Sequence, residues 1–177
     1  QWIWSAAHTK NKVPVGSCYF RKSLKLKAPE EGEIRITADN QFQLYVNGQP
    51  VGTGSDWRKI EVFDISKQLQ KGVNTIAVEA TNSDAGSAGL VARVLIKEVG
   101  GTFQTYSTDE SWKTSVRRYR NWTAPGFPES EWVAATSFGA LGTALPWGNE
   151  MVVAGEGTRF EIPADFHIER LMQDEQV

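Results

Sequence analysis

The feature that most constrains the fold is an alternation of apolar and polar residues with a period of two. Between residues 18 and 26 the apolar side chains fall mostly on even positions and polar ones on odd positions. This period places one set of side chains on a single face of a strand, whereas a helix repeats every three or four residues. The same alternation recurs over residues 34–38, 42–46, 76–80 and 90–96. The sequence therefore predicts short strands, each with one buried face.

Turn residues separate these segments. Asn47-Gly48 is a strong hairpin signal, because both residues tolerate the positive φ of a type I′ turn. Residues 29–32, 71–74 and 83–89 are also expected to form turns. A single helical turn is predicted over 64–69, with an aspartate carboxylate at its start. Short strands joined by frequent turns predict an antiparallel sandwich or barrel.

The second half of the chain is less periodic. A further strand is expected over 102–107, and residues 117–148, rich in Trp, Pro and Gly, are expected to be ordered loop that wraps the sandwich. Within it, the basic run 117–120 is interpreted as a solvated loop. The predicted division is a β-sandwich over residues 1–150 and a tail or linker toward a following domain over 151–177.

Composition excludes several classes of protein. The 177 residues are 40% hydrophobic and 23% charged with a net charge of −2, which is normal for a globular domain. The longest apolar runs fall far short of the roughly 20 residues needed to cross a bilayer, so no membrane span is expected. Without a concentrated basic cluster, nucleic acid is not expected as the main partner. The single cysteine, Cys18, excludes an internal disulfide and is expected to be buried.

No catalytic constellation is apparent. Glycoside hydrolysis needs two carboxyl groups facing each other across a sugar, but 21 acidic residues make chance pairs inevitable. His8 and His167 belong to no metal or triad motif, and no serine lies in a nucleophile elbow. The segment is therefore predicted not to be an enzyme by itself.

A set of separated motifs keeps its order and approximate spacing along residues 2–148. The motifs are Trp2-Ile3-Trp4, Cys18-Tyr19-Phe20-Arg21-Lys22, Thr37-Ala38-Asp39-Asn40-Gln41-Phe42, Asp64-Ile65-Ser66, Gly72-Val73-Asn74-Thr75-Ile76, Thr108-Asp109-Glu110-Ser111-Trp112 and Pro146-Trp147-Gly148. The set resembles the galactose-binding-like jelly-roll accessory domains of bacterial α-L-rhamnosidases and related secreted glycosidases. The resemblance implies an all-β, antiparallel jelly-roll β-sandwich, and an extracellular or periplasmic location for the parent protein.

Polar residues at strand ends form a candidate ion site. Asp39-Asn40 ends one predicted strand, and Asn82 ends another and precedes a glycine-rich loop that contains Asp84. Carboxylate, amide and backbone carbonyl oxygens are the ligands that Ca²⁺ prefers. The resemblance implies that Asp39, Asn40 and Asn82 hold a calcium ion that contacts sugar hydroxyls. The alternative is that all three are turn residues whose side chains bond to nearby backbone.

Trp57 is the candidate sugar platform. An indole face stacks on the C–H side of a pyranose, while Asp56 and Arg58 can hydrogen-bond the hydroxyls around it. The alternative is that Trp57 closes the edge of the core. No role is assigned to Trp122 from the sequence. The tryptophans expected to pack in the core are Trp2, Trp4, Trp112, Trp132 and Trp147.

The leading hypothesis is a non-catalytic carbohydrate-binding module of a larger exported bacterial enzyme. Its expected partners are a mono- or polysaccharide and the other domains of the parent protein. The alternative is a structural interdomain scaffold of a multidomain glycosidase or dehydrogenase-like protein, with no ligand of its own. The two differ in whether Trp57, Asp39, Asn40 and Asn82 gather on one rim.

Overall fold

The computed structural model describes residues 1–148 and 150–153, which are almost entirely strand and loop. The described strands are β1 (Trp2–Ser5), β2 (Gly16–Leu26), β3 (Pro29–Asp39), β4 (Gln41–Val46), β5 (Gln49–Gly54), β6 (Lys59–Asp64), β7 (Gly72–Asn82), β8 (Gly89–Glu98), β9 (Phe103–Ser107), β10 (Lys113–Ser115), β11 (Val133–Gly139) and β12 (Val152–Val153). One 3-10 turn, η1 (Ser66–Gln68), lies between β6 and β7.

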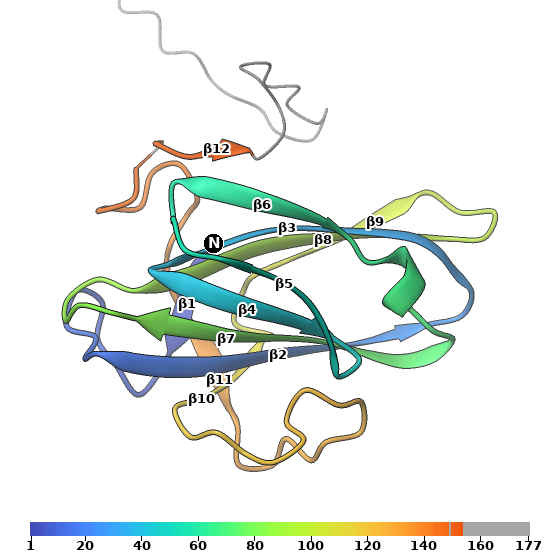
Figure 1. Ribbon diagram of the computed structural model, residues 1–177, viewed down its shortest axis with the longest axis horizontal. Helices are drawn as coiled ribbons and strands as arrows, with labels where there is room; N and C mark the ends of the chain where they lie inside the picture. The colour runs from blue at the N-terminus through green and yellow to red at the C-terminus, as the bar shows by residue number, and fades with distance from the viewer. Residues whose placement is uncertain (149, 154–177) are drawn as a thin grey trace, which may run out of the picture.

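The strands follow one hydrogen-bonded path that curls into two layers. The order along the path is β12-β6-β3-β8-β1-β11-β10-β2-β7-β4-β5, and β9 pairs with β8. One layer contains β2, β7, β4 and β5, and the other contains β6, β3, β8 and β9 (Figure 1). Among the described strand pairs, all are antiparallel except β12 with β6. The predicted antiparallel β-sandwich is confirmed.

The core lies between the layers and is closed by tryptophans. The rings of Trp2 and Trp147 stack with centroids 4.3 Å apart. Gly89 passes beneath this pair, where a Cβ atom would lie 2.7 Å from the Trp2 ring. Since two buried rings cannot shift cheaply, only glycine fits there. Cys18 is fully buried, as predicted, and all the tryptophans expected to pack are buried, together with Trp122.

Two local predictions from turn chemistry agree with the structure. β4 and β5 form a hairpin in which Asn47 and Gly48 have φ values of 51° and 82°, as a type I′ turn requires. The predicted helical turn is η1, and Asp64 accepts a hydrogen bond from the Ser66 backbone N–H at 2.9 Å.

Three local predictions were wrong. Residues 29–32 are not a turn, because β3 begins at Pro29 and passes an irregularity in its pairing with β8. Residues 133–139 are not loop but strand β11, which pairs with both β1 and β10. Residues 72–74 are not a turn but the start of strand β7, which begins at Gly72. The sandwich also extends past residue 150, because Met151 is buried in the core and β12 pairs with β6. The rest of the predicted tail lies outside the described residues.

A loop over residues 116–132 packs on the outer face of the β2-β7-β4 layer. Its Trp122 and Trp132 stack at 6.1 Å and cover Tyr19 and Ala77 of the sheet. Residues this apolar seldom remain in solvated loops, and here they form a second, smaller core.

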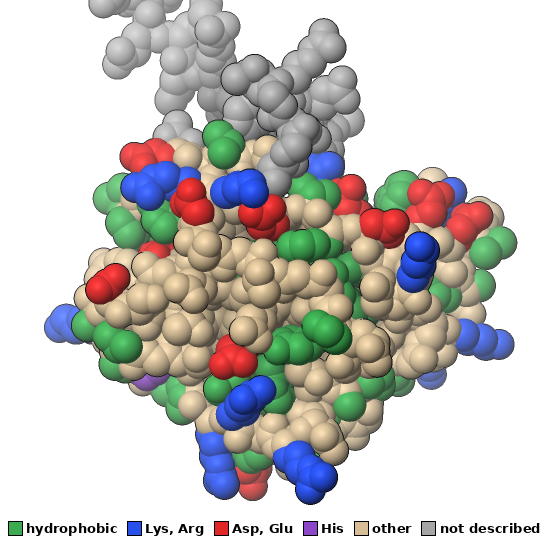
Figure 2. All heavy atoms as spheres, in the orientation of Figure 1, with side chains coloured by type: hydrophobic (Ala, Val, Ile, Leu, Met, Phe, Trp, Pro, Cys, Tyr) green, Lys and Arg blue, Asp and Glu red, His purple; other side chains and the backbone are tan. Residues whose placement is uncertain are grey.

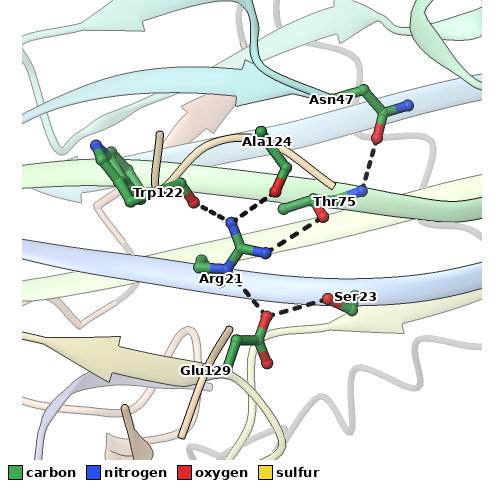
Figure 3. Close-up of polar contacts among 7 residues, drawn as sticks. All are labelled: Arg21, Ser23, Asn47, Thr75, Trp122, Ala124 and Glu129. Carbon is green, nitrogen blue, oxygen red and sulfur yellow. Dashed lines mark hydrogen bonds and ion pairs between the residues drawn. The ribbon is translucent and has the colours of Figure 1, made fainter. Parts of the chain in front are cut away.

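Arg21 anchors this loop to the sheet (Figure 3). Its guanidinium is buried, forms an ion pair with Glu129 at 2.9 Å and donates hydrogen bonds to the backbone carbonyls of Trp122 and Ala124. It also lies 5.1 Å from the Phe127 ring centroid. One buried cation therefore holds both the middle and the later part of the loop.

Replacing Arg21 is expected to destabilise the protein strongly. In Arg21→Met the aliphatic stem is kept, but two carbonyls lose their Arg21 donor and Glu129 keeps only the Ser23 hydroxyl, which costs about 3 kcal/mol. Urea unfolding followed by tryptophan fluorescence measures the loss. The matched control is Lys25→Met on the same strand, where the exposed side chain should change stability by less than about 0.5 kcal/mol. Equal effects in the two variants would contradict the anchoring role.

The described part of the chain contains no helix with the length and apolar character needed to span a lipid bilayer.

Candidate functional site

The predicted polar residues meet at one edge of the sandwich. Asp39 is the last residue of β3 and Asn82 is the last residue of β7, while Asn40 links β3 to β4. The Asn40 backbone N–H donates to the carbonyl of Thr81 at 3.1 Å, and the Asn40 side-chain oxygen accepts from the Ser83 backbone N–H at 2.7 Å. We call this group, with the adjoining loop 83–88, the rim.

Asn82 carries the strongest sign of a missing partner. Its side chain is fully buried, and its amide nitrogen donates to the carbonyls of Val13 and Pro14 at 3.2 and 3.0 Å. Its side-chain oxygen is buried and accepts no hydrogen bond from the described residues. A buried acceptor without a donor is unfavourable and rare in native proteins. The indole N–H groups of Trp2, Trp4 and Trp132 are also buried without a partner among the described residues, so the Asn82 oxygen by itself marks only an acceptor that a cation or a hydrogen-bond donor can use.

Asp39 is a buried carboxylate tied to the core. Only 7% of the residue is exposed, and one carboxylate oxygen accepts a hydrogen bond from the Trp147 indole N–H at 2.9 Å. The pKa of Asp39 is raised, mainly because burial disfavours the charged carboxylate, and the negative charge of Asp84 adds to this effect. The Trp147 hydrogen bond and the positive charge of Arg58 act in the opposite direction and lower the pKa. Arg58 and Asp84 are thus within electrostatic reach of Asp39.

The turn between β5 and β6 brings Asp56, Trp57 and Arg58 toward the rim. The Thr37 hydroxyl donates to the carbonyls of Asp56 and Trp57, both at 3.2 Å, and so fixes the turn to β3. The Asp56 carboxylate accepts from the Arg58 backbone N–H at 3.0 Å, which is a turn-stabilising role. One carboxylate oxygen of Asp56 is therefore used by the turn, and Asp56 as a sugar ligand stays a prediction.

Trp57 is half-buried and its ring is partly covered. The ring packs against the core, and the Arg58 guanidinium lies 4.4 Å from its centroid. Arg58 is also 3.6 Å from the Glu150 carboxylate in an exposed ion pair. A sugar that stacks on the covered ring face would have to displace Arg58. Trp57 as an open platform remains a prediction, while the geometry favours Trp57 as a support that positions Arg58.

The rim offers oxygen atoms but few charges for a metal ion. No group of three His, Cys, Asp or Glu side chains suited to a metal occurs among residues 1–148 and 150–153. The available donors are the Asp39 carboxylate, the Asn40 and Asn82 amide oxygens and the loop carbonyls. A hard cation such as Ca²⁺ accepts this set, completed by water or hydroxyl oxygens.

Sequence reasoning missed the role of Trp147 at this site. It was expected to pack, and it does, but its indole N–H also orients Asp39. No spacing rule connects two residues 108 positions apart. The sequence signal was limited to the Pro-Trp-Gly motif, and only the fold brings the two together.

The raised pKa of Asp39 predicts a pH-dependent effect on stability. Between the unfolded pKa of about 3.9 and the higher native pKa, the native state binds more protons, so this carboxyl's contribution to the free energy of unfolding falls as pH rises. Asp39→Asn removes that titration and keeps an oxygen that can accept from Trp147. In chelator-treated protein, the stability of this variant relative to wild type should therefore increase from pH 3.5 to pH 7. Denaturant unfolding at both pH values measures the change, and a constant difference would refute it.

The chain is homologous to a segment of α-L-rhamnosidase. It is 32% identical over 162 residues to an α-L-rhamnosidase of Streptomyces avermitilis, covering 86% of this chain and 16% of that protein. The chain thus spans only a small part of the length of the relative it matches. No protein-family model matches the chain.

Solved structures agree with this homology. The crystal structure of the Streptomyces avermitilis α-L-rhamnosidase complexed with L-rhamnose matches with a TM-score of 0.77 and 28% identity, over 85% of this chain and 15% of that one. The lectin of Pleurotus ostreatus, solved in apo form and in complex with GalNAc, matches with a TM-score of 0.80 and 37% identity, over 85% of this chain and 44% of the lectin. The sandwich is therefore shared with rhamnosidase domains and with a lectin.

Proposed function

We infer from the homology with a segment of α-L-rhamnosidase that this chain is a non-catalytic carbohydrate-binding module of a larger, exported enzyme. The single observation that carries this proposal is that the oxygen-bearing side chains of Asp39, Asn40 and Asn82 gather at one strand-end edge, where Asn40 bonds to Thr81 and Ser83. The similarity to a lectin supports a sugar as the ligand.

Calcium fits the chemistry of the rim. Asp39, Asn40 and Asn82 would hold the ion through carboxylate and amide oxygens, and the loop 83–88 would add backbone carbonyls. The ion would supply the partner that the Asn82 oxygen lacks. Because Asp39 and the nearby Asp84 are the acidic groups of the rim, the protein alone would bind Ca²⁺ weakly, and sugar hydroxyls would complete the coordination shell.

Arg58 is the proposed direct donor to the sugar. Its guanidinium lies on the Trp57 ring, and more than half of the Arg58 side chain is exposed. Its positive charge is close enough to Asp39 to lower the pKa of that carboxyl. The ring limits the rotamers of the long side chain, which lowers the entropy lost when Arg58 binds a hydroxyl. Trp57 thus contributes through the position of Arg58 and through its own apolar edge.

Calorimetry tests the proposed site directly. The 177-residue chain should bind L-rhamnose or GalNAc in the presence of Ca²⁺ and lose most of that binding in chelator. Asp39→Asn should weaken sugar binding at least about tenfold, because a charged oxygen ligand of the ion is lost. The control Glu31→Gln removes one exposed negative charge at the opposite end of β3 and should bind as wild type. If neither sugar binds with or without Ca²⁺, the scaffold hypothesis replaces this one.

The roles of Arg58 and Trp57 can be separated by one comparison. If Arg58 donates to the sugar, Arg58→Ala should weaken binding about fivefold, the effect of losing one exposed charge-assisted hydrogen bond. If Arg58 merely blocks the ring, the same variant should bind more tightly because Trp57 becomes an open platform. Trp57→Ala weakens binding in both cases, so the direction of the Arg58→Ala effect decides. Thermal unfolding of each variant controls for loss of the fold.

A further inference from the structure

A second hollow lies on the outer face of the sandwich, away from the strand-end rim. It has a volume of about 450 Å³ and is lined by Tyr45 of β4 and by residues 118–123 of the loop that Arg21 anchors. The sequence analysis interpreted this basic run as solvated loop. The structure confirms that its arginines are exposed in a loop, and it places that loop against the sheet as one wall of a concave surface.

The wall is rigid because its neighbours are fixed. Trp122 stacks on Trp132 and meets Tyr19 and Tyr45 edge-on, with ring centroids 5.1 and 5.9 Å apart. The Tyr119 hydroxyl donates to Glu131 at 2.7 Å. A fixed loop presents its charged side chains at defined positions, which lowers the entropy lost on binding.

Two arginines at this hollow have no acidic partner. Arg117 lies over the Tyr119 ring at 5.2 Å, but Arg118 and Arg120 are exposed and form no ion pair with the described residues. Figure 2 shows basic side chains gathered at the end of the molecule where this loop lies. The whole chain has a net charge of −2, so this positive cluster is a local departure from the overall balance.

The surroundings of the cluster favour a sugar acid over a protein partner. The nearest sheet residues toward the rim are polar: Tyr45 donates to Gln43 at 2.7 Å, and Tyr19 donates to Glu79 at 3.3 Å. A stable protein interface needs a fully buried apolar centre, whereas Trp122 and Trp132 are already buried in the domain. Planar guanidinium groups match carboxylates, and hydroxyl-rich ligands match the tyrosine, glutamine and asparagine side chains.

We propose that Arg118 and Arg120, with Tyr45 and Asn121, form a second saccharide site that binds an acidic sugar unit of a polysaccharide. This site is separate from the rim and needs no metal ion. The guanidinium groups would take the anionic group, and the Tyr45 ring edge and the Asn121 amide would contact the rest of the sugar. A module that binds one polysaccharide chain at two sites holds it more tightly than either site alone would, although the contacts at each site stay the same.

The test uses polygalacturonate and its fully methyl-esterified form, which has the same backbone without the charge. In affinity electrophoresis and calorimetry at low salt, wild type should bind the acid polymer and not the ester. Arg118→Gln/Arg120→Gln should weaken binding about tenfold, the effect of two exposed charge-assisted contacts. Lys25→Gln/Lys27→Gln removes the same charge from exposed positions at the end of β2 and just after it, and should bind as wild type.

Further measurements identify the anionic group that is bound and the site that binds it. Dextran sulfate replaces carboxylate with sulfate, and the polymer that binds more tightly identifies the anionic group. Wild type should bind polygalacturonate equally well in chelator, which removes any cation from the rim, so failure of the rim site and failure of this site are distinguishable. Absence of binding to either acidic polymer would overturn the proposal and leave the arginines as contacts for an acidic neighbouring domain. Equal weakening by the lysine and arginine pairs would also overturn it, because it would show general charge attraction.

Discussion

The indole of Trp147 joins the packing of the core to the chemistry of the rim. Its ring stacks on Trp2 above Gly89, and its N–H group holds one oxygen of Asp39. A buried carboxylate is tolerated only where it is hydrogen-bonded, and this bond comes from a ring that itself cannot move without opening the core. The position of the rim carboxylate is therefore set by the closest-packed part of the sandwich.

The sheet could be predicted from sequence because its signals are local. Alternation over β2, β3, β7 and β8 and the Asn47-Gly48 turn each act within a few residues. Strand β11 was missed because its partners β1 and β10 lie on both sides and its sequence alternates weakly. Pairing supplied by distant strands can override a weak local pattern.

The sequence predicted which residues of the candidate site gather at one edge, but it did not predict how their side chains interact. Asp39, Asn40 and Asn82 could be expected to lie close together, because residues at the ends of neighbouring strands share one edge of the sandwich. The orphaned oxygen of Asn82 and the guanidinium over Trp57 could not be predicted, because both depend on side-chain contacts made across the fold. The same holds for Arg21, whose place among alternating residues gave no sign that it anchors a loop more than 100 positions away.

The Trp147–Asp39 contact also gives the protein an intrinsic optical reporter. An indole whose N–H group points at a carboxylate is exposed to the electric field of that group, so its emission depends on whether the carboxylate is charged, protonated or neutralised by a cation. Occupancy of the rim by a cation would then change the field at one of the seven tryptophans, and the difference in emission between wild type and a Trp147→Phe variant would report it with no label attached to the protein or to the sugar.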